Sequence, residues 1–385
     1  MRKFIWFCLL LLFGLQGFGG EKAFFVTWTG DPAHTAVVRW FDGGELSFRI
    51  QGSSEWKPVK SLLVAEEEGV RVYSADLVDL QGDTRYELSF NSRDAVGFFK
   101  TLPEALNRPI RIVIGGDIYL EEGLFAKMNR QIRQRQPDMA ILGGDLAYTE
   151  GGKGTFKSRA AKWHKWKLFI EELQAQTQTT EGRILPILFV VGNHDISKWE
   201  PKLAQQMFYK IAPMPEKEIA YRPFEVAGKL QFILLDSGHS APIPGVQTFW
   251  LEKLLKEQHS FAYRIPVYHI AAFPTVESYK AKLPLQIREF WVPLFEKYGV
   301  KLAFEHHNHA NKRTYPIWQG RVNQERGVVY LGDGSWGTRL RKTEKRWYLA
   351  KRNRANAVWL LTLSKEGLLA EAIDSKGQVL DAINF

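Results

Sequence analysis

Short stretches in which apolar and polar residues alternate follow an apolar N-terminal segment and fill the first hundred residues. The expected strands are Phe24–Thr29, Thr35–Phe41, Leu46–Gln51, Val70–Leu77, Arg85–Asn91 and Gly97–Thr101. Gly30-Asp31-Pro32 and Asp42-Gly43-Gly44, which separate the first three, are typical of turns. Strands at this spacing without helices between them predict a small all-β sandwich over residues 21–103. The alternative is a β-rich extension of the following domain.

After Arg108 the pattern changes, and apolar, β-branched runs alternate with stretches of helical spacing. Helices are expected at Glu121–Gln136 and Ala160–Gln174, and strands at Ile110–Ile114, Met139–Leu142, Ile184–Val191, Leu230–Leu235, Ile265–Tyr268, Val300–Phe304, Val328–Leu331, Ala357–Leu363 and Leu368–Ile373. Buried strands that alternate with helices predict an α/β domain in which a layered β-sheet is flanked by helices. We assign this domain to residues 104–385.

The first twenty residues have the pattern of a secretory signal peptide. Arg2 and Lys3 precede an apolar run, Phe4–Phe13, and glycines follow it. The run is short for a membrane span, although an uncleaved N-terminal anchor is the alternative. No later stretch is apolar enough to cross a bilayer, so we expect a secreted mature protein, whether periplasmic, extracellular or on the cell surface.

Composition narrows the chemistry. Of the 385 residues, 45% are hydrophobic and 24% are charged, which excludes a mostly disordered chain. The single cysteine, Cys8, lies within the expected signal, so disulfides within the chain and cysteine-based metal sites are excluded as well.

The formal net charge of +10 is concentrated near the C-terminus. Residues 339–354 contain eight basic side chains and one acidic side chain, Glu344, together with Trp347 and Tyr348. Basic and aromatic side chains together could bind a nucleic acid or another polyanion. We favour a solvated loop that flanks the functional site, because such runs are common on protein surfaces.

Polar residues suited to metal binding follow the C-terminal ends of five expected strands. They are Asp117, Asp145, Asn193, His194, His269, His307 and His309. One such aspartate is usually a turn or cap residue, but turn chemistry does not explain five strand ends that share one edge of a sheet. Oxygen and imidazole donors without thiolates suit iron, zinc or manganese.

These residues fall into ordered motifs: Gly116-Asp117, Gly144-Asp145-Leu146-Ala147-Tyr148, Gly192-Asn193-His194, Val267-Tyr268-His269 and His307-Asn308-His309. The set resembles the metallophosphoesterases of the calcineurin-like superfamily, and the Gly-Asp-x-x-Tyr form resembles their purple acid phosphatase branch. Thr27-Trp28, Asp31-Pro32, Tyr86 and Phe99–Pro103 resemble the fibronectin type III-like domain that precedes the catalytic domain in that branch.

The resemblance implies a dinuclear centre and a phosphate ester as substrate. Asp117, Asp145, Tyr148 and His309 would hold Fe(3+), and Asp145, Asn193, His269 and His307 a divalent Fe, Zn or Mn ion, with Asp145 bridging the two. Tyr148 would supply a phenolate, the hard anionic donor that gives the ferric enzymes their colour; without the motifs, a packed aromatic would be the simpler interpretation. Attack by metal-bound hydroxide would then hydrolyse phosphate monoesters at mildly acidic pH.

The resemblance also assigns roles around the metals. His194 would assist the leaving group, or else orient a neighbour, and Asp195 would fix the tautomer of its imidazole. His239, Arg313 and Tyr279 are candidates for substrate contact; a loop-ordering hydrogen bond is an alternative for His239, and a surface role for Arg313.

The chain departs from the family pattern in three places. Tyr119 stands where the family has glycine, and would crowd or line the first metal. His306 replaces the glycine before the His-x-His motif, and we expect a structural role for it rather than a third ligand. The substrate-binding histidines of the plant enzymes are missing between Phe273 and Leu283, where Tyr279 lies instead.

The sequence therefore supports three functional hypotheses. The first is a secreted acid phosphatase. The second is a phosphodiesterase or nucleotidase that uses the same metals, because the plant-type histidines are absent. A non-catalytic polyanion-binding surface protein is the third, suggested by the sandwich and the basic run.

Overall fold

The computed structural model describes residues 22–91, 94–151, 158–198, 202, 206–257, 261–332 and 334–385. The expected signal peptide and Cys8 lie outside the described residues. Among the described residues, no helix combines the length and the apolar character that crossing a bilayer requires.

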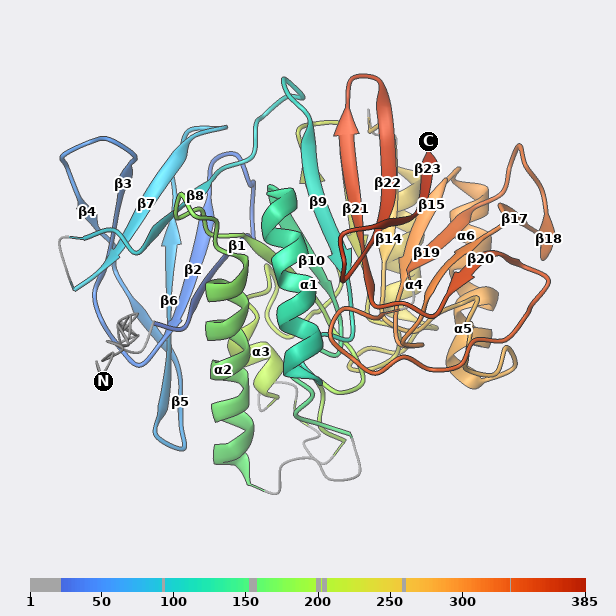
Figure 1. Ribbon diagram of the computed structural model, residues 1–385, viewed down its shortest axis with the longest axis horizontal. Helices are drawn as coiled ribbons and strands as arrows, with labels where there is room; N and C mark the ends of the chain where they lie inside the picture. Colours follow the sequence, from blue (N-terminus) through green and yellow to red (C-terminus); the bar gives the residue numbers. More distant parts are fainter. Residues whose placement is uncertain are drawn as a thin grey trace, which may run out of the picture.

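The N-terminal region consists of two antiparallel four-stranded sheets, drawn in blue at the left of Figure 1. Their strand orders are β1-β2-β6-β5 and β4-β3-β7-β8, and the buried faces share one core that includes Trp40 and Leu88. The all-β sandwich expected from the alternating pattern is confirmed. Its strands are β1 (Phe24–Thr27), β2 (Ala36–Phe41), β3 (Leu46–Ile50), β4 (Lys57–Pro58), β5 (Leu62–Glu67), β6 (Val70–Leu77), β7 (Arg85–Phe90) and β8 (Gly97–Lys100).

A six-stranded mixed sheet begins the second region, in the order β11-β10-β9-β21-β22-β23. β9, β10 and β11 are parallel, and β21, β22 and β23 continue the sheet antiparallel. β10 is buried along its whole length, as the continuous apolar run Met139–Leu142 predicts for an interior parallel strand. The strands are β9 (Ile110–Gly115), β10 (Met139–Gly143), β11 (Ile187–Val190), β21 (Ala357–Ser364), β22 (Gly367–Asp374) and β23 (Val379–Asn384).

A seven-stranded sheet packs against the first, in the order β12-β13-β14-β15-β19-β16-β20. Its four central strands are parallel, and the outer strands β12, β16 and β20 run antiparallel to their neighbours. The strands are β12 (Arg222–Val226), β13 (Leu230–Leu234), β14 (Tyr263–Val267), β15 (Leu302–Glu305), β16 (Asn311–Thr314), β19 (Val329–Gly332) and β20 (Leu349–Asn353), and β17 (Ile317–Trp318) pairs with β18 (Arg321–Val322) beside it.

Helices cover the outer faces of both sheets, which gives four layers. On β9 and β10, alternate residues such as Ile112 face the opposing sheet, whereas Val113 faces α1 and α2. These two helices run side by side in Figure 1. The helices on the first side are α1 (Glu122–Arg135), α2 (Arg159–Thr177) and α3 (Met207–Ile211), and those that pack on the second sheet are α4 (Val246–Lys256), α5 (Lys282–Phe290) and α6 (Val292–Lys297). The α/β class with a layered sheet is confirmed.

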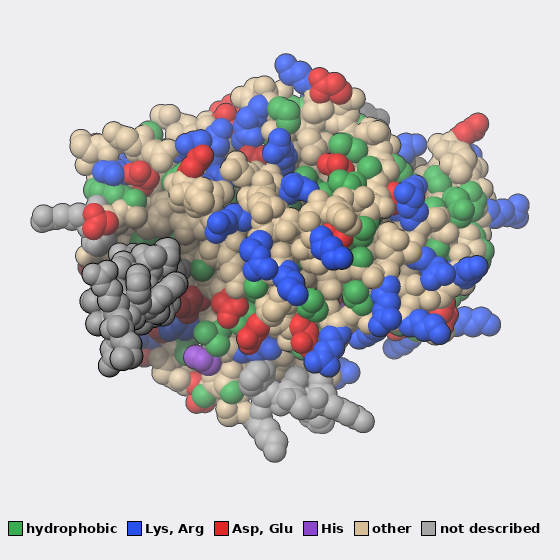
Figure 2. All heavy atoms as spheres, in the orientation of Figure 1, with side chains coloured by type: hydrophobic (Ala, Val, Ile, Leu, Met, Phe, Trp, Pro, Cys, Tyr) green, Lys and Arg blue, Asp and Glu red, His purple; other side chains and the backbone are tan. Residues whose placement is uncertain are grey.

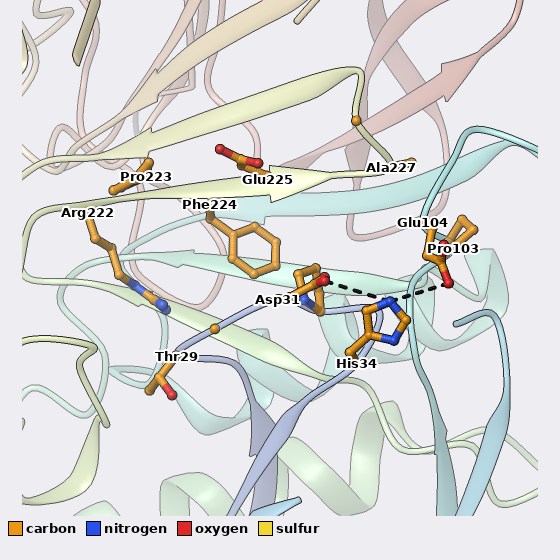
Figure 3. A pocket seen from close by; sticks show the side chains of 13 residues that line it. Thr29, Asp31, His34, Pro103, Glu104, Arg222, Pro223, Phe224, Glu225 and Ala227 are labelled. Atoms are coloured by element: carbon orange, nitrogen blue, oxygen red, sulfur yellow. Dashed lines mark ion pairs between the residues drawn. The ribbon is translucent and has the colours of Figure 1, made fainter. Parts of the chain in front are cut away.

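The sandwich packs directly on the layered region. Arg222 on β12 donates from Nη1 to the carbonyl of Trp28 (2.7 Å), and Phe25 meets Phe189 edge to face. Beside this contact, a cavity of about 570 Å³ opens between the two regions. Figure 3 shows His34 in this cavity, close to both Asp31 and Glu104.

Candidate metal centre

Acidic and imidazole side chains from both sheets meet at one edge. Asp117 follows β9, Asp145 follows β10, His269 follows β14 and His307 follows β15. One ligand atom from each lies within 4.8 Å of the others. The four strands are parallel members of two sheets, so their carboxyl ends bring the side chains together as the sequence pattern predicts.

The backbone at this edge is left-handed at five of the expected ligands. Asp117, Asp145, Tyr148, His307 and His309 have φ between 53° and 75°. Residues with a Cβ rarely adopt this conformation, which costs on the order of 1 kcal/mol or more at each position. Several such residues at one site are typical of functional centres in which the surrounding structure imposes the geometry.

Asp117, Tyr148 and His309 form one half of the cluster. The Tyr148 hydroxyl donates to Oδ1 of Asp117 (3.0 Å) and lies 3.3 Å from Nε2 of His309. The same imidazole nitrogen is 2.9 Å from Oδ1 of Asp117. Three of the four groups expected to hold the first metal therefore converge on one point.

The other half is centred on His269. Its Nδ1 donates to the carbonyl of Gly143 (2.9 Å), which directs Nε2 toward the cluster. Nε2 then lies 3.3 Å from Oδ2 of Asp145, 3.2 Å from Oδ1 of Asn193 and 3.3 Å from Nδ1 of His307.

This arrangement of acceptors fits a cation. Oδ2 of Asp145 is buried, and no described residue donates a hydrogen bond to it. The carboxylate, amide and imidazole atoms around His269 Nε2 are electron-pair donors, so they require a positive charge between them, either a proton or a metal ion. The residues present therefore suit a dinuclear site of oxygen and nitrogen ligands.

Burial and neighbouring charges shift the pKa values of the clustered side chains. Burial disfavours charged imidazole, but Asp145 and Asp117 raise the pKa of His269 to about 9. Burial and the charge on His269 lower the pKa of His307 to about 4. Burial also opposes ionisation of Asp145, yet His269 holds the pKa of that carboxyl well below its usual range. A positive charge is thus stabilised where the ligand atoms converge.

Two glycines allow the chain to approach the aspartates closely. A Cβ added at Gly334 would lie 1.7 Å from Oδ2 of Asp117, and one added at Gly192 would lie 2.3 Å from Oδ1 of Asp145. Gly192 belongs to a recognised motif. Gly334 was not singled out from the sequence, because only the fold brings it next to Asp117.

His194 lies beside Asp145, but the hydrogen-bond partner of its ring differs from the predicted Asp195. Its Nδ1 hydrogen-bonds the carbonyl of Glu150, and its Nε2 lies 3.9 Å from Oδ2 of Asp145. Asp195 instead accepts the backbone N–H groups of Gly192 (2.8 Å), Asp145 (2.9 Å) and Leu146 (2.9 Å). Asp195 therefore fixes the two ligand loops to each other, and the expected contact with the His194 ring is wrong.

His239 is the only one of the three substrate candidates that the structure places beside the described ligands. Its ring centroid lies 5.5 Å from that of His269, and its Nε2 lies 3.1 Å from the hydroxyl oxygen of Ser237. Burial lowers the pKa of His239 to about 4. The ring is therefore neutral over the ordinary pH range.

Tyr279 and Arg313 are engaged elsewhere. Tyr279 stacks on Tyr348 and lies under the guanidinium of Arg288. Arg313 donates two hydrogen bonds to Asp381 on β23 (2.7 and 3.2 Å). This geometry does not support the phosphate contact suggested for Arg313.

The two unusual residues of the motifs also pack away from the ligands. Tyr119 lies in the core between α1 and α2, where its hydroxyl donates to Glu172 (2.8 Å), so it does not line the first metal position. His306 is fully buried, and neither ring nitrogen has a hydrogen-bond partner among the described residues. Its ring fills the space above Gly116 and Gly143, since a Cβ added at Gly143 would lie 2.1 Å from Nε2. The structural role expected for His306 agrees with this placement.

A buried ion pair supports the loop after β14. Glu305 and Lys312 are both fully buried and paired, and Glu305 also accepts from the Tyr268 hydroxyl (2.7 Å) and the Ala272 N–H (2.8 Å). Because Tyr268 precedes His269, this network helps to hold that ligand in place. No motif singles out Glu305 in the sequence, because its partners are distant along the chain.

Much of the basic run 339–354 is paired within the chain. Arg339 pairs with Glu121, Arg346 with Glu344, and Lys351 with Asp381. Figure 2 shows Lys and Arg side chains spread over one face of the molecule, with Asp and Glu among them. Arg341 differs: its N–H donates to the carbonyl of His309 (3.1 Å), and its charge acts on Tyr148 and His307. The run therefore brings a cation to the centre.

Comparison with known proteins places these observations in a family. A family model described as calcineurin-like phosphoesterase matches residues 110–311. Purple acid phosphatase 21 of Arabidopsis thaliana is 22% identical over 278 residues, which cover 70% of this chain and 59% of the plant protein. An uncharacterized protein of Mycobacterium tuberculosis is 23% identical over 324 residues, which cover 70% of this chain and 58% of that protein. The chain thus spans less than two thirds of the length of these relatives.

Solved structures share the fold over nearly the whole chain. Purple acid phosphatase PPD1 from seeds of yellow lupin (Lupinus luteus) matches with a TM-score of 0.75 at 18% identity, covering 94% of this chain and 73% of the lupin chain. The structure of PhoD matches with a TM-score of 0.69 at 10% identity, covering 94% and 88%. The fibronectin type III-like assignment of the sandwich stays a prediction. The family match and the ligand cluster lead to one conclusion: the chain belongs to the calcineurin-like phosphoesterase family.

Proposed function

We propose that this protein is an exported acid phosphatase that hydrolyses phosphate monoesters with a dinuclear centre of Fe(3+) and a divalent Fe, Zn or Mn ion. The observation that carries the proposal is the position of the Tyr148 hydroxyl, 3.0 Å from Asp117 and 3.3 Å from His309. A phenol at that point offers the hard anionic donor that a trivalent ion prefers over a divalent one.

The ligand assignment follows the two halves of the cluster. Asp117, Tyr148 and His309 would hold the ferric ion, and Asn193, His269 and His307 the divalent ion. Asp145 would bridge them, since it has two oxygens and one of them accepts no hydrogen bond from a described residue. When bound, two adjacent cations neutralise phosphate charge and lower the pKa of water.

His194 would supply the proton that the leaving alcohol needs. Its Nδ1 hydrogen-bonds the Glu150 carbonyl, so Nε2 is the nitrogen that faces Asp145 and would meet a substrate bound there. The side chain is 20% exposed, so the ring can reach a bound ester and still exchange protons with solvent. A group in this position is suited to general acid catalysis.

Metal analysis combined with a visible spectrum of the purified protein tests the proposal. We expect bound iron, an absorption band in the visible region, and faster hydrolysis of a phosphate monoester than of a bis-ester near pH 5–6. Faster hydrolysis of the bis-ester would instead identify a phosphodiesterase. Protein that binds a polyanion but takes up no metal would overturn the enzymatic proposal.

Export rests on residues 1–20. Sequencing the N-terminus of the protein isolated from its native source tests it, and we expect the mature chain to begin near residue 21. A chain that retains Met1 would contradict cleavage.

A further inference from the structure

A cavity of about 570 Å³ adjoins the metal centre and has the size of a small-molecule site. Asn193 and His307 form its metal-facing wall, and His239 and Ile270 line it as well. An ester whose phosphate lies at the metals would therefore extend its alcohol into this cavity, and the remaining lining residues would contact that alcohol.

Glu277 is the acidic residue that lines this cavity. The residue is half-buried, and its Oε2 is buried without a hydrogen-bond partner among the described residues. The half-buried Glu67, by contrast, has partners: its Oε2 accepts from Arg159 and Trp163. The cost of burying an unpaired carboxylate is offset better by a hydrogen bond from a cationic donor than by one from a neutral donor.

The metal motif itself holds Glu277 in position. Asn308, which lies between the ligands His307 and His309, is fully buried and accepts the N–H groups of Val276 and Glu277, both at 2.7 Å. The backbone of residue 277 is therefore tied to the same turn that carries two ligands. The Cα of residue 277 is therefore held at a fixed place relative to the ligand turn, which limits the positions its carboxylate can take.

The other charges near the cavity do not cancel this preference. Lys198 lines the cavity but is exposed, so water solvates its ammonium group. Arg341 acts on Glu277 at long range but forms no ion pair with it. Burial raises the pKa of Glu277, and the charges of Arg341 and His269 oppose that shift.

We propose that Glu277 selects phosphate esters of amino alcohols by binding the ammonium group of the leaving alcohol. In the reaction, the oxygen of water bonds to phosphorus and the bond between phosphorus and the alcohol oxygen breaks. One proton of the water remains on inorganic phosphate or passes to solvent, and the alcohol oxygen takes up one proton, so the products are inorganic phosphate and the amino alcohol with its ammonium group unchanged. The inference rests on the proposed phosphatase function and specifies its substrate class.

A pair of isosteric substrates tests the proposal. Ethanolamine phosphate and n-propyl phosphate differ chiefly in an ammonium group in place of a methyl group. We expect the metal-loaded wild type to favour ethanolamine phosphate in kcat/KM by about tenfold or more, as a charge-assisted hydrogen bond would give. Glu277→Gln keeps the size of the side chain and should reduce this preference to near unity, mainly by lowering kcat/KM for the ammonium ester.

Lys198→Gln is the matched control, because it removes the opposite charge from the same cavity. It should leave the preference unchanged or increase it. An equal loss of preference in both variants, or an unchanged preference in Glu277→Gln, would overturn the proposal. Coincident thermal unfolding of the three proteins would show that folding is not the cause.

Binding measurements separate this inference from the proposed function. Calorimetric titration of both phosphates into the metal-loaded proteins measures the same preference without turnover. If neither ester is hydrolysed, the phosphatase proposal fails, while a tenfold binding preference that disappears in Glu277→Gln still supports Glu277. If both esters are hydrolysed and bound equally, the phosphatase proposal stands and the Glu277 inference fails.

Discussion

The rings of Tyr148 and His194 are neighbours, with centroids 4.8 Å apart, but their polar atoms have different partners. Tyr148 directs its hydroxyl to Asp117 and His309, where it can act as a ligand. His194 hydrogen-bonds the Glu150 carbonyl through Nδ1, and its Nε2 lies 3.9 Å from Oδ2 of Asp145. In the proposed function one ring would bind metal and its neighbour would transfer a proton, and single substitutions can separate the two roles.

Replacing Tyr148 with Phe removes the hydroxyl and keeps the packing of the ring. In iron-loaded protein we expect the visible absorption band to disappear, because the phenolate donor is lost. Far-UV circular dichroism should stay unchanged as a control for folding. An identical visible band in the variant would rule out tyrosinate ligation.

Replacing His194 with Asn removes the proton donor but keeps a polar side chain. For alkyl phosphates we expect kcat to fall about 10²–10⁴-fold with little change in KM. The loss should be much smaller for an activated aryl phosphate, whose leaving group needs no proton. Steady-state kinetics on both substrates measures this difference, and equal losses would argue for an orienting role instead.

At the scale of elements, the ends of β9 and β10 and the motif after β15 fit one another. Each of the two strands ends in paired glycines, and the His306 ring occupies the space above Gly116 and Gly143. The sheets can approach here only because these positions lack a Cβ.

Gly143→Ala should therefore destabilise the protein by about 1–3 kcal/mol, the usual cost of overpacking a core. Urea denaturation of metal-free protein measures the change in the free energy of unfolding. Gly143→Ala combined with His306→Ala supplies the control: the second substitution opens space, so the cost of the first should shrink markedly. Additive costs would show that the two positions do not interact.

Strands buried on both faces could be predicted from the sequence, because runs such as Met139–Leu142 have few alternative environments. The outer strand β16, with the polar sequence Asn-Lys-Arg-Thr, could not, since its pairing with β19 and β20 depends on tertiary contacts. The helices α4, α5 and α6 were not anticipated either. These helices are short, and their amphipathic pattern can be recognised only once their packing on the second sheet is known.

The same contrast holds within the site. The ligands follow strand ends in recognisable motifs, so their convergence was predictable. Arg313 follows the His-x-His motif closely, but its place on β16 directs it to Asp381 on another strand. Glu277 belongs to no motif, and only its contact with Asn308 reveals its connection to the centre.

At the scale of the whole molecule, polar contacts join the sandwich to the layered region. Arg39 donates to the carbonyls of Lys210 and Ile211, both at 2.7 Å. Glu67 on β5 pairs with Arg159 on α2 and with Lys210 on α3. The sandwich is therefore held against the catalytic layers on several sides, and we expect the two regions to unfold together.

Glu67→Gln tests this connection through its pH dependence. Burial alone would raise the pKa of Glu67, but hydrogen bonds from Arg159, Lys210 and Trp163 lower it to about 2, from an ordinary value of 4.5. A lowered folded-state pKa stabilises the protein above pH 4.5, and this contribution disappears as the pH falls toward 2.

Wild type should thus be more stable than Glu67→Gln at pH 7, and the difference should shrink as the pH falls below 4.5. Urea denaturation at several pH values measures it. Glu66→Gln, at an exposed neighbouring position on β5, should show little difference at any pH. A Glu67→Gln deficit that does not depend on pH would contradict the ionic contribution.

The contact between His306 and Gly143 also constrains evolutionary history. Histidine at position 306 and a side chain at position 143 compete for the same space. A lineage that carried both should bear a loss of stability, which selection would disfavour. The two positions should therefore vary together across the family.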